Sequence, residues 1–287
     1  MNIKLIRHLS VASVLLSSAT AFAAPLSVTV YNPGDKGIFP VSSEIVSGDK
    51  ESILVDAQFG VSDGQALVDL LNKRGKKLTT IYISNGDPDY YFGLEPIKKA
   101  FPNVKVMASQ YVVDHINQTK TAKLAYWGPI LGKQAPSTLI VPEVLTQPYL
   151  TLEGQRIDIK EMNTPYAYLW APSIKTAFGG VLVSSGLHVW MADNQTTAAR
   201  KEWVAALNRL LDLKPDRVVP GHFVGAAPKG TVAVKFTRDY ILKFDAESAK
   251  AKNADGLVEK MKLAYPSLQA DAGLTIGAKV AKGEMKW

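Results

Sequence analysis

The chain has 287 residues, no cysteine and a formal net charge of +7. Without cysteine it can form no disulfide, so its stability must come from a hydrophobic core, and its length suffices for one large α/β domain. The basic residues are scattered rather than gathered into a stripe with exposed aromatic residues, which excludes nucleic acid as the expected partner.

Residues 1–23 have the pattern of a signal peptide. Lys4 and Arg7 precede an apolar run, and Ala21-Phe22-Ala23 matches the small-residue cleavage site. We therefore expect cleavage near Ala23, a periplasmic or secreted protein of net charge about +5, and a single domain over residues 24–287. The apolar run is too short for a retained membrane span, and no later segment approaches the roughly 20 apolar residues that a span requires.

The first half of the chain alternates strands and helices. Strands are predicted at 27–31, 41–46, 52–55, 78–84 and 104–107, and helices after Ser62, at 94–100 and at 110–117. From 120 to 146 the periodicity fades, and Pro129 and Pro136 interrupt the segment. We expect a long irregular excursion there, of the kind that forms lids or pocket walls.

The second half repeats the alternation. Turn residues such as Gly179-Gly180 separate its first strands, which favours antiparallel pairs. The clearest helix has Trp203 and Leu207 on one face, ends before Pro215, and leads to a strand at 217–219. Two β halves, each backed by helices, predict a four-layer αββα sandwich of the α/β class. The other strands are predicted at 149–152, 156–159, 167–170 and 181–184, and the helices at 197–213, 232–251 and 255–264.

Two strands end abruptly in polar residues. The strand at 78–84 leads into a loop with two carboxylates, Asp87 and Asp89, and an amide, Asn85. The strand at 217–219 leads into Gly221-His222. Because ligands of open α/β sheets bind outside the carboxyl ends of the strands, we expect these two turns to face each other across one cleft.

At these residues the chain resembles the metallo-β-lactamase superfamily of metal-dependent hydrolases. In that family a strand ends in H-x-H-x-D-H, followed by a glycine. Asp89 matches the motif aspartate, and His222 matches the last metal-binding histidine. The resemblance extends from the opening strands to His222 and implies the same αββα fold. The motif frame carries Asn85, Asp87, Asp89 and Tyr90 here, with Gly93 in place.

The resemblance also implies a metal site, of which this chain keeps only a part. Four histidines are present, and His8 belongs to the signal peptide, so the complete dinuclear zinc site of the family cannot be assembled. His188 stands near the position of the bridging aspartate. Oxygen donors favour hard ions, so we expect one divalent ion, zinc, manganese, iron or calcium, or none. The candidate ligands are Asn85, Asp87, Asp89 and His222.

Two functions follow from this comparison. In the first, one metal ion activates water against an ester, lactone or amide, Asp89 or His188 orients the water or takes its proton, and Tyr90 protonates the leaving group. In the alternative, the protein is catalytically inactive and binds an apolar small molecule. Both imply a small-molecule partner, and the oligomeric state stays open.

Structural roles are also open for the same residues. Asp87 and Asp89 could bond backbone amides around Pro88 as an Asx-turn pair, and loop carbonyls could hold His222. Tyr90 could merely fill the vacant site, and His115 is expected to be a surface or packing residue. A third function, from the Asp-x-Asp motif of glycosyltransferases, is weak because nucleotide sugars are scarce outside the cytoplasm.

Overall fold

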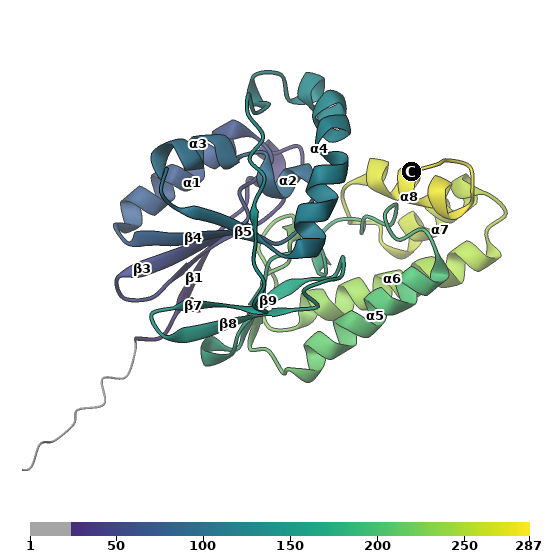
Figure 1. The fold of residues 1–287 in the computed structure, drawn as a ribbon. Helices are drawn as coiled ribbons and strands as arrows, with labels where there is room; N and C mark the ends of the chain where they lie inside the picture. Colours follow the sequence, from purple (N-terminus) through teal and green to yellow (C-terminus); the bar gives the residue numbers. More distant parts are fainter. Residues whose placement is uncertain (1–23) are drawn as a thin grey trace, which may run out of the picture.

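The computed structural model describes residues 24–287, and the predicted signal peptide, residues 1–23, lies outside the described residues. Two β-sheets pack face to face, and helices cover the outer face of each sheet (Figure 1). The chain therefore forms the predicted four-layer sandwich. Within residues 24–287, no helix combines the length and the apolar character that crossing a membrane would require.

The first sheet has six strands in the order β1-β2-β3-β4-β5-β6. The first three pair antiparallel, and β3 to β6 pair parallel because helices make the connections between them. β2 and β3 are the most buried strands of this sheet, since both of its faces are covered. The strands are β1 (Ser27–Tyr31), β2 (Ser43–Ser47), β3 (Glu51–Val55), β4 (Lys77–Ile83), β5 (Lys105–Ala108) and β6 (Glu143–Val144), and the helices are α1 (Val61–Arg74), α2 (Pro88–Tyr91), α3 (Leu94–Ala100) and α4 (Gln110–Leu131).

The second sheet has five strands in the order β12-β10-β9-β8-β7, and β11 and β13 form a separate parallel pair. Its first three strands in chain order form the predicted antiparallel meander. The strands are β7 (Tyr149–Leu152), β8 (Gln155–Lys160), β9 (Tyr168–Ala171), β10 (Thr176–Phe178), β11 (Ser184–Ser185), β12 (Arg217–Val218) and β13 (His222–Phe223), and the helices are α5 (Thr197–Asp212), α6 (Val232–Lys250), α7 (Ala254–Ala264) and α8 (Asp271–Ala281).

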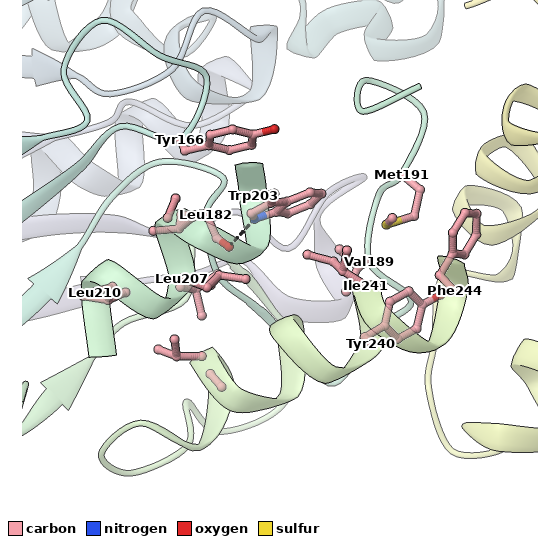
Figure 2. Packing of buried hydrophobic residues seen from close by; sticks show 14 of the residues in the cluster. Tyr166, Leu182, Val189, Met191, Trp203, Leu207, Leu210, Tyr240, Ile241 and Phe244 are labelled. Carbon is pink, nitrogen blue, oxygen red and sulfur yellow. Dashed lines mark hydrogen bonds between the residues drawn. The ribbon is translucent and has the colours of Figure 1, made fainter. Parts of the chain in front are cut away.

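Hydrophobic cores lie between the layers and hold them together. Between the two sheets, Val46, Val55 and Tyr82 of the first sheet pack against apolar residues of the second. On the far side of the second sheet, Trp203 of α5 is buried against α6, and its indole nitrogen donates to the carbonyl oxygen of Leu182 over 2.9 Å (Figure 2). These contacts fix the sheets relative to each other, and with them the strand exits that form the site.

Helix α4 is much longer than the sequence predicts. Ser109 caps it, since its hydroxyl accepts from the backbone N–H of Val112 over 3.3 Å. Instead of ending near residue 117, the helix continues to Leu131 and replaces the first part of the predicted excursion. Pro129 lies in the last turn, where its missing N–H removes one hydrogen bond from a helix that is about to end.

Two other segments differ from the prediction. Only Ser184 of the strand predicted at 181–184 is in a strand, because Gly179 and Gly180 have left-handed backbones, with φ of 76° and 73°, and turn the chain out of the second sheet. The second segment lies near the C-terminus, where α8 forms although no helix is predicted there, and it buries Leu274 and Ala278 against the α5–α7 layer.

Candidate functional site

The structure brings the two polar strand exits together. Asp89 lies in α2, directly after the exit of β4, and His222 begins β13. The imidazole Nε2 of His222 donates to Asp89 Oδ2 over 2.8 Å, and the hydroxyl of Tyr90 lies 3.3 Å from Nδ1 of the same ring. Both nitrogens of His222 therefore have partners within the protein.

A close contact between backbones makes this approach possible. A Cβ atom on Gly221 would lie 1.8 Å from the carbonyl oxygen of Gly180 and 3.3 Å from the Tyr90 hydroxyl. The turn that carries His222 also accepts hydrogen bonds from Ser42, whose N–H and hydroxyl donate to the carbonyl oxygens of Gly221 and Pro220. Only glycine fits at position 221 without displacing His222.

A buried polar bridge joins the two sheets next to this pair. Asp56 follows β3, is inaccessible to solvent, and accepts hydrogen bonds from the N–H of Ser84 over 2.7 Å and from its hydroxyl over 2.5 Å. The Ser84 oxygen in turn accepts from the N–H of Gly180 over 2.8 Å. Burial raises the pKa of Asp56 to about 7, although the bonds from Ser84 act in the opposite direction.

Asp87 has different partners from Asp89. Its Oδ1 lies 3.0 Å from Nζ of Lys123 and 3.7 Å from Nε2 of His115, both on α4. Partial burial opposes the ionised form, but His115 and Lys123 outweigh it and hold the pKa of Asp87 at about 2. The N–H of Asp87 donates to Oδ1 of Asn85 over 2.8 Å, so the amide of Asn85 supports the turn itself.

The pairing of Asp87 with Lys123 predicts a measurable titration. Lys123→Met is expected to raise the pKa of Asp87 from about 2 by roughly one unit or more, because the closest positive charge is removed while His115 remains. Carbon-13 NMR of the aspartate carboxyl groups measures this pKa. Lys120→Met, on the same helix but bonded to Asn117, is the control, and an unchanged Asp87 titration in Lys123→Met would contradict the ion pair.

His188 lies against the C-terminal helices and not in this group. Its Nδ1 is 2.9 Å from the hydroxyl of Tyr240 on α6, and its Nε2 is 3.8 Å from Asp271 on α8. Burial lowers the pKa of the imidazole, and the charge of Asp271 opposes this shift. No described contact joins His188 to Asp89 or His222, so its position is explained by packing against α6 and α8.

The residues present do not fit a metal ion of the expected kind. Asp89 and His222 bond directly to each other, and Asp87 is already neutralised by Lys123. Among the described residues, no group of three or more histidine, aspartate or glutamate side chains is placed to hold a metal. Each of the four candidate ligands, Asn85, Asp87, Asp89 and His222, thus has at least one donor or acceptor atom engaged inside the chain.

Sequence reasoning missed two residues of this site. Lys123 lies on the part of α4 that was expected to be irregular, so no helical face pointed to it. Ser84 reads as the last residue of a buried strand, and only the approach of Gly180 from the second sheet reveals its role. Asp56 carried a usable signal, since it also follows a strand directly and lies at the same edge of the sheet.

Comparison with known proteins agrees with this fold. The family model described as the metallo-beta-lactamase superfamily matches residues 37–222. A metallo-beta-lactamase from Pontibacter korlensis is 18% identical, with a TM-score of 0.56 over 78% of this chain and 97% of that one. A metallo-beta-lactamase family protein from Thermus thermophilus is 17% identical, with a TM-score of 0.60 over 90% of this chain and 91% of the other.

A more distant likeness covers another kind of hydrolase. A double mutant of the sec-alkyl sulfatase PisA1 is 16% identical, with a TM-score of 0.56 over 91% of this chain and 50% of that one. At such low identity these likenesses concern the fold alone. No curated protein matches the chain.

Proposed function

This chain belongs to the metallo-beta-lactamase superfamily, and from that premise we propose that it uses the hydrolase fold to bind a small apolar molecule without a resident metal ion. The observation that carries the proposal is the direct bond of 2.8 Å between Asp89 and His222. In a metal-dependent hydrolase of this family both side chains would be free to bind the ion, which would activate a water molecule. Here each is the other's partner.

The acid–base groups that hydrolysis would require are also hydrogen-bonded to other side chains of the protein. A general base needs a free nitrogen or oxygen within hydrogen-bond reach of the substrate, and both nitrogens of His222 already have partners. Tyr90 is fully buried, and burial followed by the charge of Asp89 raises its pKa well above the usual value for tyrosine. A hydroxyl of this kind is a poor proton donor to a leaving group.

Aromatic side chains near Asp87 support an apolar ligand. Tyr111, at the start of α4, is partly exposed, and burial followed by the charges of Asp87 and Asp193 raises its pKa. The indole N–H groups of Trp190 and Trp287 both donate to Asp193, and the centres of the two rings are 5.2 Å apart. These rings offer the large, rigid apolar surface that small-molecule sites commonly use.

Metal content and probe binding together test this proposal. In protein purified without chelators we expect far less than one metal ion per chain, and no thermal shift with manganese, zinc or calcium. We also expect the neutral fluorescent probe N-phenyl-1-naphthylamine to bind, with at least about fivefold weaker affinity in Tyr111→Ala, because an aromatic contact is lost. Tyr126→Ala, which removes an exposed aromatic residue from the other end of α4, is the control.

The opposite results would favour the hydrolase. Near-stoichiometric metal, together with ester, lactone or amide turnover that is lost in Asp89→Asn, would overturn the proposal. Equal probe binding by Tyr111→Ala and the parent protein would place the ligand elsewhere.

Export is a further part of the proposal. Cleavage near Ala23 would deliver the protein to the periplasm or the medium. N-terminal sequencing of protein recovered from those fractions tests this directly, and an intact Met1 there would contradict it.

A further inference from the structure

His188 is buried where three separate parts of the chain meet. Its side chain is only 1% exposed. Nδ1 lies 2.9 Å from the hydroxyl of Tyr240 on α6, and Nε2 faces Asp271, in the first turn of α8, over 3.8 Å. The backbone N–H of His188 donates to the carbonyl oxygen of Gln269, just before α8, over 2.8 Å. The imidazole therefore lies at the point where α8 attaches to the rest of the protein.

The hydroxyl of Tyr240 determines which protonation state of the imidazole fits this position. Tyr240 is inaccessible to solvent, and the backbone N–H of Val189 acts as a donor to its oxygen. The hydroxyl hydrogen is then left for Nδ1 of His188, which accepts it as the unprotonated nitrogen of a neutral ring. A proton on Nδ1 would break this bond and turn the hydroxyl hydrogen toward the rings of Phe236 and Tyr265, which pack on Tyr240.

The charges near the ring do not compensate for this loss. Burial lowers the pKa of His188, the charge of Asp271 opposes this shift, and the charge of Lys262 adds to it. Asp271 is itself paired with Lys262, whose Nζ lies 2.5 Å from its Oδ2. The titratable groups around the ring are Tyr240 from α6, Lys262 from α7 and Asp271 from α8, with Tyr265 behind Tyr240.

Helix α8 covers the segment that carries the imidazole. A Cβ atom on Gly273 would lie 3.2 Å from the ring of Trp190, and one on Gly277 would lie 3.0 Å from the Cβ of Met191. Beyond α8, the ring of Trp287 packs against Trp190, with 5.2 Å between the ring centres. A proton from solvent can therefore reach the buried imidazole only when α8 and the residues after it move away.

We propose that His188 is a pH-sensitive switch for the C-terminal segment, residues 271–287: protonation of the imidazole under mildly acidic conditions loosens the attachment of α8. The opened state takes up a proton below about pH 6.5, the ordinary range of histidine, whereas the attached state resists it. A proton thus favours opening, as any ligand favours the state that binds it. Trp287 moves with α8, so acid also withdraws an aromatic ring from Trp190. The switch does not depend on which molecule the cleft binds.

Hydrogen exchange measured by mass spectrometry on the purified protein tests the switch. Peptides from residues 271–287 are compared at about pH 7.5 and about pH 5, after correction for the intrinsic pH dependence of exchange. In the parent we expect local opening there to become at least about threefold more frequent at the lower pH, with peptides from α1 unchanged. His188→Asn keeps an acceptor near the position of Nδ1 but cannot titrate, so its opening should be equal at both pH values. His115→Asn, on α4, is the matched control and should behave like the parent.

Several results would overturn the switch. It fails if opening of residues 271–287 in the parent does not depend on pH, or if His188→Asn keeps the pH dependence of the parent. Equal acceleration of the α1 peptides would also overturn it, because the whole domain would then be opening. If His188→Asn does not fold, Tyr240→Phe takes its place. That variant lacks the hydroxyl whose bond protonation breaks, so the acid effect should fall at least about twofold, and an unchanged acid effect would contradict the proposal.

Discussion

Replacing Glu44 with glutamine is expected to stabilise the protein by roughly 3–5 kcal/mol at alkaline pH and to change its stability little under acidic conditions. Glu44 lies on β2 and is inaccessible to solvent, and neither of its carboxyl oxygens has a hydrogen-bond partner. A charge in such a place is strongly disfavoured. Glutamine has the shape of the protonated acid and cannot ionise.

The pH dependence follows from the direction of the shift. Burial, and then the charge of Asp56, raises the pKa of Glu44 from 4.5 to about 8, although the Ser42 hydroxyl and then the charge of Arg217 act in the opposite direction. The folded state therefore binds a proton more tightly than the unfolded state does. The stability that this proton contributes is fully present below about pH 4.5 and is lost as the pH rises through about 8.

Melting temperatures of the parent and Glu44→Gln, measured from pH 5 to pH 9.5, test this expectation. The two curves should lie close together at the acidic end and separate steadily until the pH passes about 8. Glu259→Gln, at an exposed position on α7, should follow the parent throughout. Parallel curves for the parent and Glu44→Gln would mean that Glu44 is not a buried, protonated acid.

Gly221→Ala is expected to destabilise the fold by at least about 2 kcal/mol and to break the contact between His222 and Asp89. The added Cβ would lie 1.8 Å from the Gly180 oxygen, which is backbone and cannot rotate away. The turn must move as a whole, and His222 moves with it.

Gly128→Ala separates this steric effect from the general effect of replacing glycine. Its Cβ would meet only Leu124, at 3.9 Å, inside α4, so the substitution should be neutral or stabilise by about 0.5–1 kcal/mol. Chemical denaturation measures both variants, and the NMR signals of the His222 ring report its surroundings. Equal stability of the two alanine variants would show that the turn at Gly221 can move without a loss of stability.

The layers and the meeting of the two strand exits could be predicted because both follow from local patterns. Apolar segments at strand and helix spacing must bury one face, and few layered arrangements achieve this. Asp89 and His222 could be brought together because each follows a predicted strand of an open sheet and matches a family motif. Neither step requires knowledge of which side chains pair.

The pairings themselves could not be predicted, because they depend on packing between distant segments. Glu44 reads as an ordinary polar residue on a strand until the second sheet covers it. In the sequence Lys123 looks like an ordinary solvated lysine. Its pairing with Asp87 becomes apparent only because α4 extends past residue 117 and brings the two side chains together. The sequence shows the spacing of a metal-binding motif. It does not show that Asp89 and Asp87 of this motif bond to His222 and Lys123 of the same chain.

The bridge from Asp56 through Ser84 to Gly180 is made of side chains and backbone alone. Where a bound ion cross-links two loops, their relative position varies with how fully the site is loaded. Here hydrogen bonds within the chain join the strand exits of the two sheets. The spacing between these exits is therefore set by Asp56, Ser84 and Gly180 themselves, and a substitution at any of the three would alter it.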